Sequence, residues 1–164
     1  MACLMKLPII LPLSHDSIAV GEDWTKLINP IEQFAMLRSI PNMHVIRPGD
    51  AVEMAAAWKL AIESTENPTA LILTRQNVET MENSSVEGVS KGAYVIGKEE
   101  NHLDAIIIAS GSEVNLAMKA KKRYFLKKVL MYVLYLCHAK KSLINKMNNT
   151  KKLFCQMQCV NVYQ

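Results

Sequence analysis

The last 46 residues of this 164-residue chain contain no aspartate, glutamate, glycine or proline. Residues 1–118 hold all 15 acidic residues, all 6 glycines and all 6 prolines. The last 46 residues also hold 11 of the 19 lysines and arginines, so the net charge of +4 is the sum of −7 for residues 1–118 and +11 for residues 119–164. A continuous fold seldom changes composition so abruptly, so the two segments need separate explanations.

Other absences exclude whole classes of protein. The longest apolar run, residues 129–137, has 9 residues, whereas a helix needs about 20 to span a bilayer. The first residues lack the basic region that precedes the apolar core of a signal peptide. The 4 cysteines form no legible disulfide framework or zinc pattern. At 50% hydrophobic and 21% charged, the chain is not of a disordered or collagen-like class. We expect a cytoplasmic protein.

Short apolar runs in the first half of the chain have the length of buried strands. They lie at residues 5–13, 44–48 and 69–74. Helical patterns alternate with these runs, at residues 31–37 and 51–64, and Asp50 with Glu53 predicts an N-cap and a capping box for the second helix. Alternating strands and helices indicate an α/β fold, a parallel sheet with covering helices.

A second unit follows a polar, Ser/Glu-rich connection at residues 79–90. A brief strand is expected at 92–96, then a buried strand at 104–109, a turn at 110–113 and a helix at 114–122. We therefore predict the start of a second α/β domain, followed by an irregular or helical basic tail. The expected division is 1–82 for the first domain, 83–101 for a linker, 102–122 for the second domain and 123–164 for the tail.

Seven short stretches, in order and without large gaps, together resemble transketolase. They are HDSIAVGED at 15–23, PIEQ at 30–33, LRSIPN at 37–42, RPGD at 47–50, TRQN at 74–77, GVSKG at 88–92 and ASGSE at 109–113. The resemblance covers roughly residues 5–122. It implies the end of the family's pyrimidine-binding domain joined to the start of its C-terminal domain, which is part of a thiamin-diphosphate-binding fold.

The resemblance also implies an activity and a site. Transketolases are homodimers that transfer a two-carbon ketol unit between sugar phosphates in the pentose phosphate pathway, using thiamin diphosphate and a divalent metal, Mg or Ca. By resemblance, His15 and Arg75 hold the sugar phosphate and Asp23 reads a substrate hydroxyl. The chemistry suits these roles, because an arginine fork matches a phosphate, an imidazole can donate to its oxygens, and a carboxylate accepts from a hydroxyl.

Without the family context, simpler interpretations of these residues are favoured. A His-Asp pair after a strand more often caps a loop, and an arginine at a strand end is more often a surface charge. The order of the seven stretches reverses both preferences for His15 and Arg75. For Gly111 a tight turn between strand and helix remains the better interpretation.

The chain departs from the family at two places. After Asp23 the family continues Gly-Pro-Thr-His-Xaa-Pro, whereas this chain continues WTKLINP at 24–30, with one extra residue and without that histidine. Deleting one base from each of three runs in a permitted coding sequence restores the family motif. A shifted frame likewise makes much of residues 125–164 resemble the transketolase C-terminal domain. We therefore expect residues from about Arg123 onward to be out of frame, through sequencing errors or a real frameshift.

The rival function is a non-catalytic α/β module whose basic tail binds nucleic acid or a membrane surface. A basic amphipathic helix could form beside the apolar run at 129–137, from Lys119, Lys121, Lys122, Arg123, Lys127 and Lys128. We favour a transketolase fragment that is inactive alone, because the cofactor-binding domain and the family's cofactor-activating glutamate are missing. Such a fragment is expected to bind no cofactor, no nucleic acid and no membrane.

Overall fold

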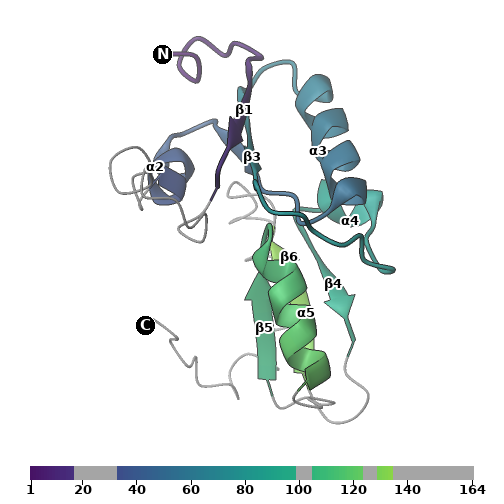
Figure 1. Ribbon diagram of the computed structural model, residues 1–164. Coiled ribbons are helices and arrows are strands. Elements are labelled where there is room, and N and C mark those ends of the chain that lie inside the picture. The colour runs from purple at the N-terminus through teal and green to yellow at the C-terminus, as the bar shows by residue number, and fades with distance from the viewer. Residues whose placement is uncertain (17–32, 99–104, 124–128, 135–164) are drawn as a thin grey trace.

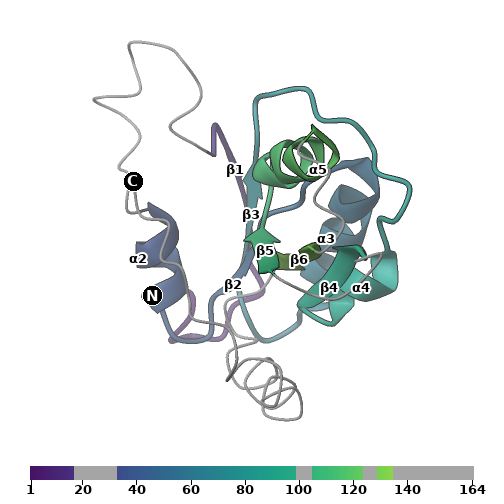
Figure 2. The ribbon, with the colours of Figure 1, turned by 90° about the horizontal axis from the view of Figure 1, so that it is seen from below.

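The computed structural model describes residues 1–16, 33–98, 105–123 and 129–134. Three parallel strands form a first sheet in the order β1-β3-β2. They are β1 (Ile10–Ser14), β2 (His44–Ile46) and β3 (Thr69–Leu73). Helix α2 (Gln33–Ser39) lies on one face of this sheet and α3 (Ala51–Glu63) on the other (Figure 2). The predicted parallel sheet with covering helices is confirmed, although the first strand begins later than expected.

Apolar side chains leave the first sheet on both faces, as buried parallel strands require. Towards α3, Ile46 and Leu71 pack with the small residues Ala56, Ala57 and Ala61. Towards α2, Val45, Ala70 and Ile72 pack with Leu37, Met43 and Cys3. Successive residues of one strand point to opposite faces, so Val45 and Ile46 enter different clusters. The alanines let α3 approach the sheet closely.

The start of α3 follows the predicted capping pattern. Asp50 is extended, and its side chain accepts a hydrogen bond from the Glu53 amide at 2.9 Å. The Glu53 carboxylate turns back to accept from the Gly49 amide at 2.6 Å, one residue before the expected partner in a capping box. The helix ends at Ser64, whose amide donates to the Leu60 carbonyl.

The second sheet has the order β4-β6-β5, with β4 antiparallel and β5 parallel to β6. Its elements are α4 (Val86–Ser90), β4 (Ala93–Gly97), β5 (Ala105–Ala109), α5 (Glu113–Arg123) and β6 (Val129–Leu134). The two sheets lie one beyond the other (Figure 1). They share one apolar core, because Val89, Ile96 and Val114 cluster with Ile46 and Leu71.

Strand β6 corrects one expectation from the sequence. Residues 129–134 were expected to be irregular or helical, but they form the central strand of the second sheet. Valine and tyrosine favour strands, and β4 and β5 offer backbone partners on both sides. Strand β4 lies within the range predicted as a linker, 83–101, and pairs with β6.

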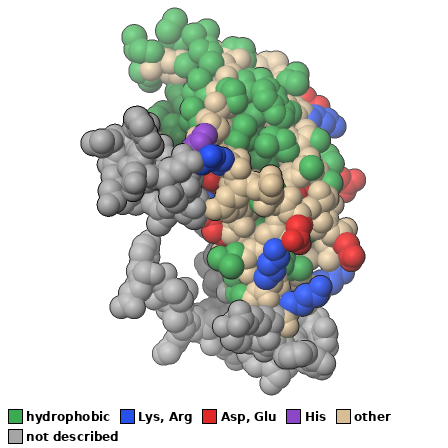
Figure 3. Space-filling view, in the orientation of Figure 1, with side chains coloured by type: hydrophobic (Ala, Val, Ile, Leu, Met, Phe, Trp, Pro, Cys, Tyr) green, Lys and Arg blue, Asp and Glu red, His purple; other side chains and the backbone are tan. Residues whose placement is uncertain are grey.

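Exposed apolar side chains gather around the N-terminal segment and β1, and Figure 3 shows a broad hydrophobic area on that side. Within the N-terminal segment, the most exposed of these side chains are Met1 at 91%, Leu4 at 83% and Met5 at 61%. Patches of this kind mark sites of contact with other proteins or with membranes, ligand-binding grooves, or surfaces prone to aggregation. Among the described residues, none of the helices has the length and apolar character needed to cross a membrane.

Candidate functional site

The carboxyl ends of β1, β2 and β3 meet at one edge of the first sheet, because the three strands are parallel. His15 follows β1, Arg47 follows β2, and Arg75 comes two residues after β3. Ser14 pairs with Leu73 in the register of the sheet. In open α/β sheets, ligands bind beyond the carboxyl ends of the strands. This edge is therefore the candidate site.

His15 is half-buried and has a left-handed backbone, with φ of 65°. Its Nδ1 lies 3.0 Å from the Ser14 hydroxyl oxygen. A non-glycine residue in this region is uncommon and costs free energy, so the surrounding contacts must hold it there. The next residue, Asp16, is buried with 2% of its surface exposed and supplies such a contact.

Arg75 is exposed at the end of β3, just after Thr74, whose hydroxyl accepts a hydrogen bond from the Gln76 amide at 3.2 Å. The structure thus places two of the three predicted site residues, His15 and Arg75, after neighbouring strands at one edge of the sheet. The third, Asp23, lies outside the described residues.

Arg47 follows β2, an outer strand of the first sheet, and was not singled out from the sequence. Only 7% of the residue is exposed, and its guanidinium faces the ring of Phe34 at 4.9 Å. Nε donates to Asp16 Oδ2 at 2.8 Å, and Nη2 lies 2.7 Å from the same oxygen. Toward the second sheet, Nη2 donates to Glu113 Oε1 at 2.9 Å, and Nη1 donates to the Ser110 carbonyl at 3.1 Å. Nη1 also lies 2.6 Å from Glu113 Oε2.

The environment of Arg47 keeps it charged. Burial acts to lower the pKa of Arg47, but the hydrogen bonds and negative charges of Glu113 and Asp16 outweigh it and raise that pKa. The turn at Gly111 fits closely against this side chain. Gly111 has φ of 61°, and a Cβ built there would lie 2.6 Å from Arg47 Nε. Only glycine meets both conditions.

A second buried acid lies where α3 meets β4. Glu53 has none of its surface exposed, and the Tyr94 hydroxyl donates to its Oε1 at 2.7 Å. Burial raises the pKa of Glu53 to about 7, against the smaller opposing effects of the hydrogen bonds from Tyr94 and the Gly49 amide. Burial and the bond to Glu53 also raise the pKa of Tyr94. The hydrogen bond between Tyr94 and Glu53 joins α3, which covers the first sheet, to β4 of the second sheet.

Two clefts among the described residues lie away from His15 and Arg75. One, of about 480 Å³, is lined by His44, Glu63 and Glu66, at the amino end of β2. The other, of about 640 Å³, lies between residues 79–83 and α5. On α5, Lys119 pairs with Glu79 at 3.1 Å, and Lys121 donates to the Lys98 carbonyl. These lysines serve local contacts, whereas Lys127 and Lys128 of the proposed basic helix lie outside the described residues.

The donor set of the described residues does not fit a divalent metal. They contain no group of three or more His, Cys, Asp or Glu side chains able to hold a metal ion. A diphosphate cofactor bound through such an ion would need ligands that this part of the chain does not offer. No chemical step through thiamin diphosphate is therefore assigned to these residues.

Comparison with known protein families gives two matches. The model for "Transketolase, pyrimidine binding domain" matches residues 1–81. The model for "Transketolase-like TK C-terminal domain" matches residues 92–136, which includes β6.

Curated and solved proteins give the same assignment. The transketolase of Bacillus subtilis (strain 168) is 55% identical over 125 residues, covering 74% of this chain and 19% of that protein. A transketolase structure from Pichia stipitis superposes with a TM-score of 0.76 at 43% identity, over 82% of this chain and 20% of that chain. A structure described as "Split gene transketolase, inactive beta4 tetramer" has a TM-score of 0.63 at 25% identity, over 80% of this chain and 41% of that one. The chain thus spans about a fifth of the length of the curated relatives it matches.

Proposed function

The chain belongs to the transketolase family, and from that membership we propose that it carries the sugar-phosphate-binding part of a transketolase. Transketolases are transferases. The rival interpretation, a non-catalytic module with a nucleic-acid-binding or membrane-binding tail, has no support among the matches. In our proposal, ketol transfer between sugar phosphates belongs to the whole enzyme, to which this chain contributes the substrate side.

One observation carries this proposal: His15 and Arg75 follow adjacent parallel strands at the edge where α/β sheets bind ligands. An arginine that stands exposed at such an edge can present two parallel N–H groups to a phosphate. The imidazole of His15, which follows the adjacent strand β1, can donate to another phosphate or hydroxyl oxygen. Asp23, eight residues after His15, would accept from a substrate hydroxyl.

The cofactor and the dimer remain part of the proposal for the whole enzyme. Thiamin diphosphate, with Mg or Ca, supplies the chemistry of ketol transfer in this family, while protein groups orient the substrate and move protons. The exposed apolar surface around the N-terminal segment supports contact with more of a transketolase, in a homodimer of the family type. The split-gene relative is described as an inactive tetramer, which supports the expectation that this chain alone is inactive.

The test is the binding of ribose 5-phosphate to the full chain by calorimetry, with ribose as the control for the phosphate group. Arg75→Ala should weaken binding about 10-fold to 100-fold, because a hydrogen bond to a charged group contributes about 1.5–3 kcal/mol. Arg38→Ala is the matched control, because Arg38 is an exposed arginine in the last turn of α2, which leads to the amino end of β2. Equal affinity of the two variants would contradict the proposal.

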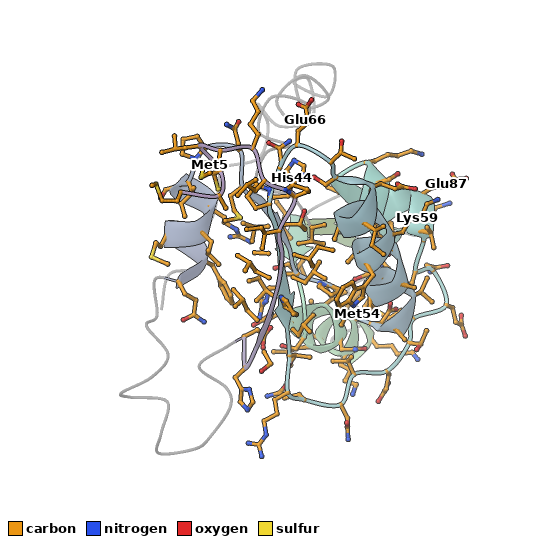
Figure 4. All side chains as sticks on the ribbon, turned by 90° about the horizontal axis from the view of Figure 1, so that it is seen from above. Met5, His44, Met54, Lys59, Glu66 and Glu87 are labelled. Carbon is orange, nitrogen blue, oxygen red and sulfur yellow. The ribbon has the colours of Figure 1, made fainter. Side chains whose placement is uncertain are left out.

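A matched pair of histidines tests the other contact. His15→Ala should weaken binding of ribose 5-phosphate, whereas His44→Ala should not. His44 begins β2 and lines a cleft together with Glu66 at the amino end of that strand (both are labelled in Figure 4). If ribose binds as tightly as ribose 5-phosphate, the site does not recognise phosphate and the proposal is wrong.

A further inference from the structure

Arg47 holds together three parts of the chain that are distant in sequence. Its guanidinium contacts Asp16 of the loop after β1, Phe34 of α2, and the turn from Ser110 to Glu113 in the second sheet. Each of its three guanidinium nitrogens donates a hydrogen bond, and Nη1 and Nη2 each lie within ion-pair distance of a carboxylate oxygen as well. These contacts on several sides fix the Arg47 side chain in one position.

We propose that Arg47 is a positioning residue for the sugar-phosphate site: it holds the loop that presents His15, and it makes the position of that loop depend on the second sheet. This inference rests on the proposed function, because it assigns a purpose to the placement of His15. Arg47 itself touches no substrate in this proposal.

Asp16 is a buried acid that lies against Arg47. Its side chain is 1% exposed, and both contacts from Arg47 reach the same oxygen, Oδ2. The other oxygen, Oδ1, is buried and has no hydrogen-bond partner among the described residues. Within that part of the chain, Arg47 is therefore the group that compensates the buried carboxylate. Without it, Asp16 would be a buried, unpaired charge, and the loop would have to open to let it reach water.

His15 lies in the same segment as Asp16. It precedes Asp16 directly and has the uncommon φ of 65°. Backbone in this region persists only where its surroundings hold it. An anchored Asp16 is such a restraint, so releasing Asp16 would let the backbone of His15 relax and turn the imidazole away from the site.

Residues that follow β5 of the second sheet hold Arg47 in turn. Nη1 contacts both the Ser110 carbonyl and Glu113, and Nη2 donates to Glu113. These contacts fix the rotation of the guanidinium plane of Arg47. The Gly111 amide donates to the Arg47 carbonyl at 3.2 Å, so the turn holds the backbone of Arg47 as well. The Glu113 side chain is 45% exposed, so solvent screens its charge more than that of Asp16. Loss of Glu113 should therefore weaken the site less than loss of Arg47.

The experiment measures ribose 5-phosphate binding to the full chain and to four variants. Arg47→Lys keeps the charge but loses the planar fork, and we expect about tenfold weaker binding. Glu113→Gln should give a smaller loss. Asp16→Ala removes the carboxylate that Arg47 anchors and leaves the contacts of Arg47 to the second sheet in place. We expect it to weaken binding even if Arg47→Lys fails to fold, and unchanged binding in this variant would overturn the inference. Val89→Ala is the control, because Val89 is fully buried in the shared core and takes no part in these contacts.

A purely structural role and a positioning role give different results. If Arg47 only stabilises the fold, Arg47→Lys and Val89→Ala will lower the melting temperature and leave the affinity of the folded protein unchanged, which overturns the inference. If Arg47 acts through His15, Arg47→Lys will add little to the loss already caused by His15→Ala. Full additivity of the two losses would also overturn it. Absence of binding in the unmodified chain would overturn the proposed function itself, and this inference with it.

Discussion

Replacing Glu53 by glutamine should remove most of the dependence of stability on pH in the neutral range. Glu53 is completely buried, and its folded-state pKa is about 7 against an ordinary value of 4.5. Between these values the folded protein binds more protons than the unfolded chain. Stability from this group is therefore fully present below about pH 4.5 and is lost as the pH rises through 7.

The size of the effect follows from the difference between the two pKa values. Each pKa unit corresponds to about 1.4 kcal/mol, so the complete loss is about 3 kcal/mol, of which about 2.5 kcal/mol falls between roughly pH 5 and pH 8. In Glu53→Gln the side-chain oxygen can accept from the Gly49 amide, and the amide nitrogen can donate to the Tyr94 oxygen. The variant therefore resembles the protonated acid and has no charge to lose.

Urea unfolding at several pH values measures this difference directly. The unfolding free energy of the unmodified chain should fall relative to that of Glu53→Gln as the pH rises. Glu63→Gln is the control, because Glu63 lies at the exposed end of the same helix, with 58% of its side chain accessible. Parallel curves for Glu53→Gln and the unmodified chain would refute the argument that burial raises the pKa of Glu53.

Two further substitutions test the contacts between the sheets and the start of α3. Gly111→Ala should destabilise the fold by about 1–3 kcal/mol from backbone strain alone, and by more because its Cβ clashes with Arg47. Gly92→Ala, at φ of 83°, controls for the strain in the same thermal melts. Asp50→Ala should lower the free energy of unfolding by about 1 kcal/mol for the lost N-cap and by about 1–3 kcal/mol for the unpaired Met81 amide. Urea unfolding measures this loss, and a loss under about 0.5 kcal/mol would contradict the capping role.

Local patterns in the sequence predicted much of the fold. The spacing of Asp50 and Glu53 predicted the start of α3, and continuous apolar runs predicted strands buried on both faces. The strand β6 was missed, because an apolar run in a lysine-rich segment fits a helix or a strand equally well until its neighbours are known. That residues from about Arg123 onward are out of frame stays a prediction; the family match extends to residue 136.

The site was only partly predictable. His15 and Arg75 were identified from motifs, and the parallel sheet explains why they share an edge. Arg47 was present in one of the same motifs, but its partners Asp16 and Glu113 lie 31 and 66 residues away in the chain. No local pattern encodes such pairs. A usable signal existed, since Asp16 and Glu113 follow closely after predicted strands and Arg47 lies near the end of another, where side chains from different strands meet.

The central claim is that His15 and Arg75 form one anion site at the carboxyl edge of the first sheet. Imidazole NMR signals recorded during titration with inorganic phosphate test it most directly. We expect the signals of His15 to shift with saturation and those of His44 to stay unchanged. Arg75→Ala should abolish the shift at His15, whereas Arg38→Ala should preserve it. Equal shifts at His15 and His44, or a shift at His15 that survives Arg75→Ala, would show that His15 and Arg75 do not share one anion site.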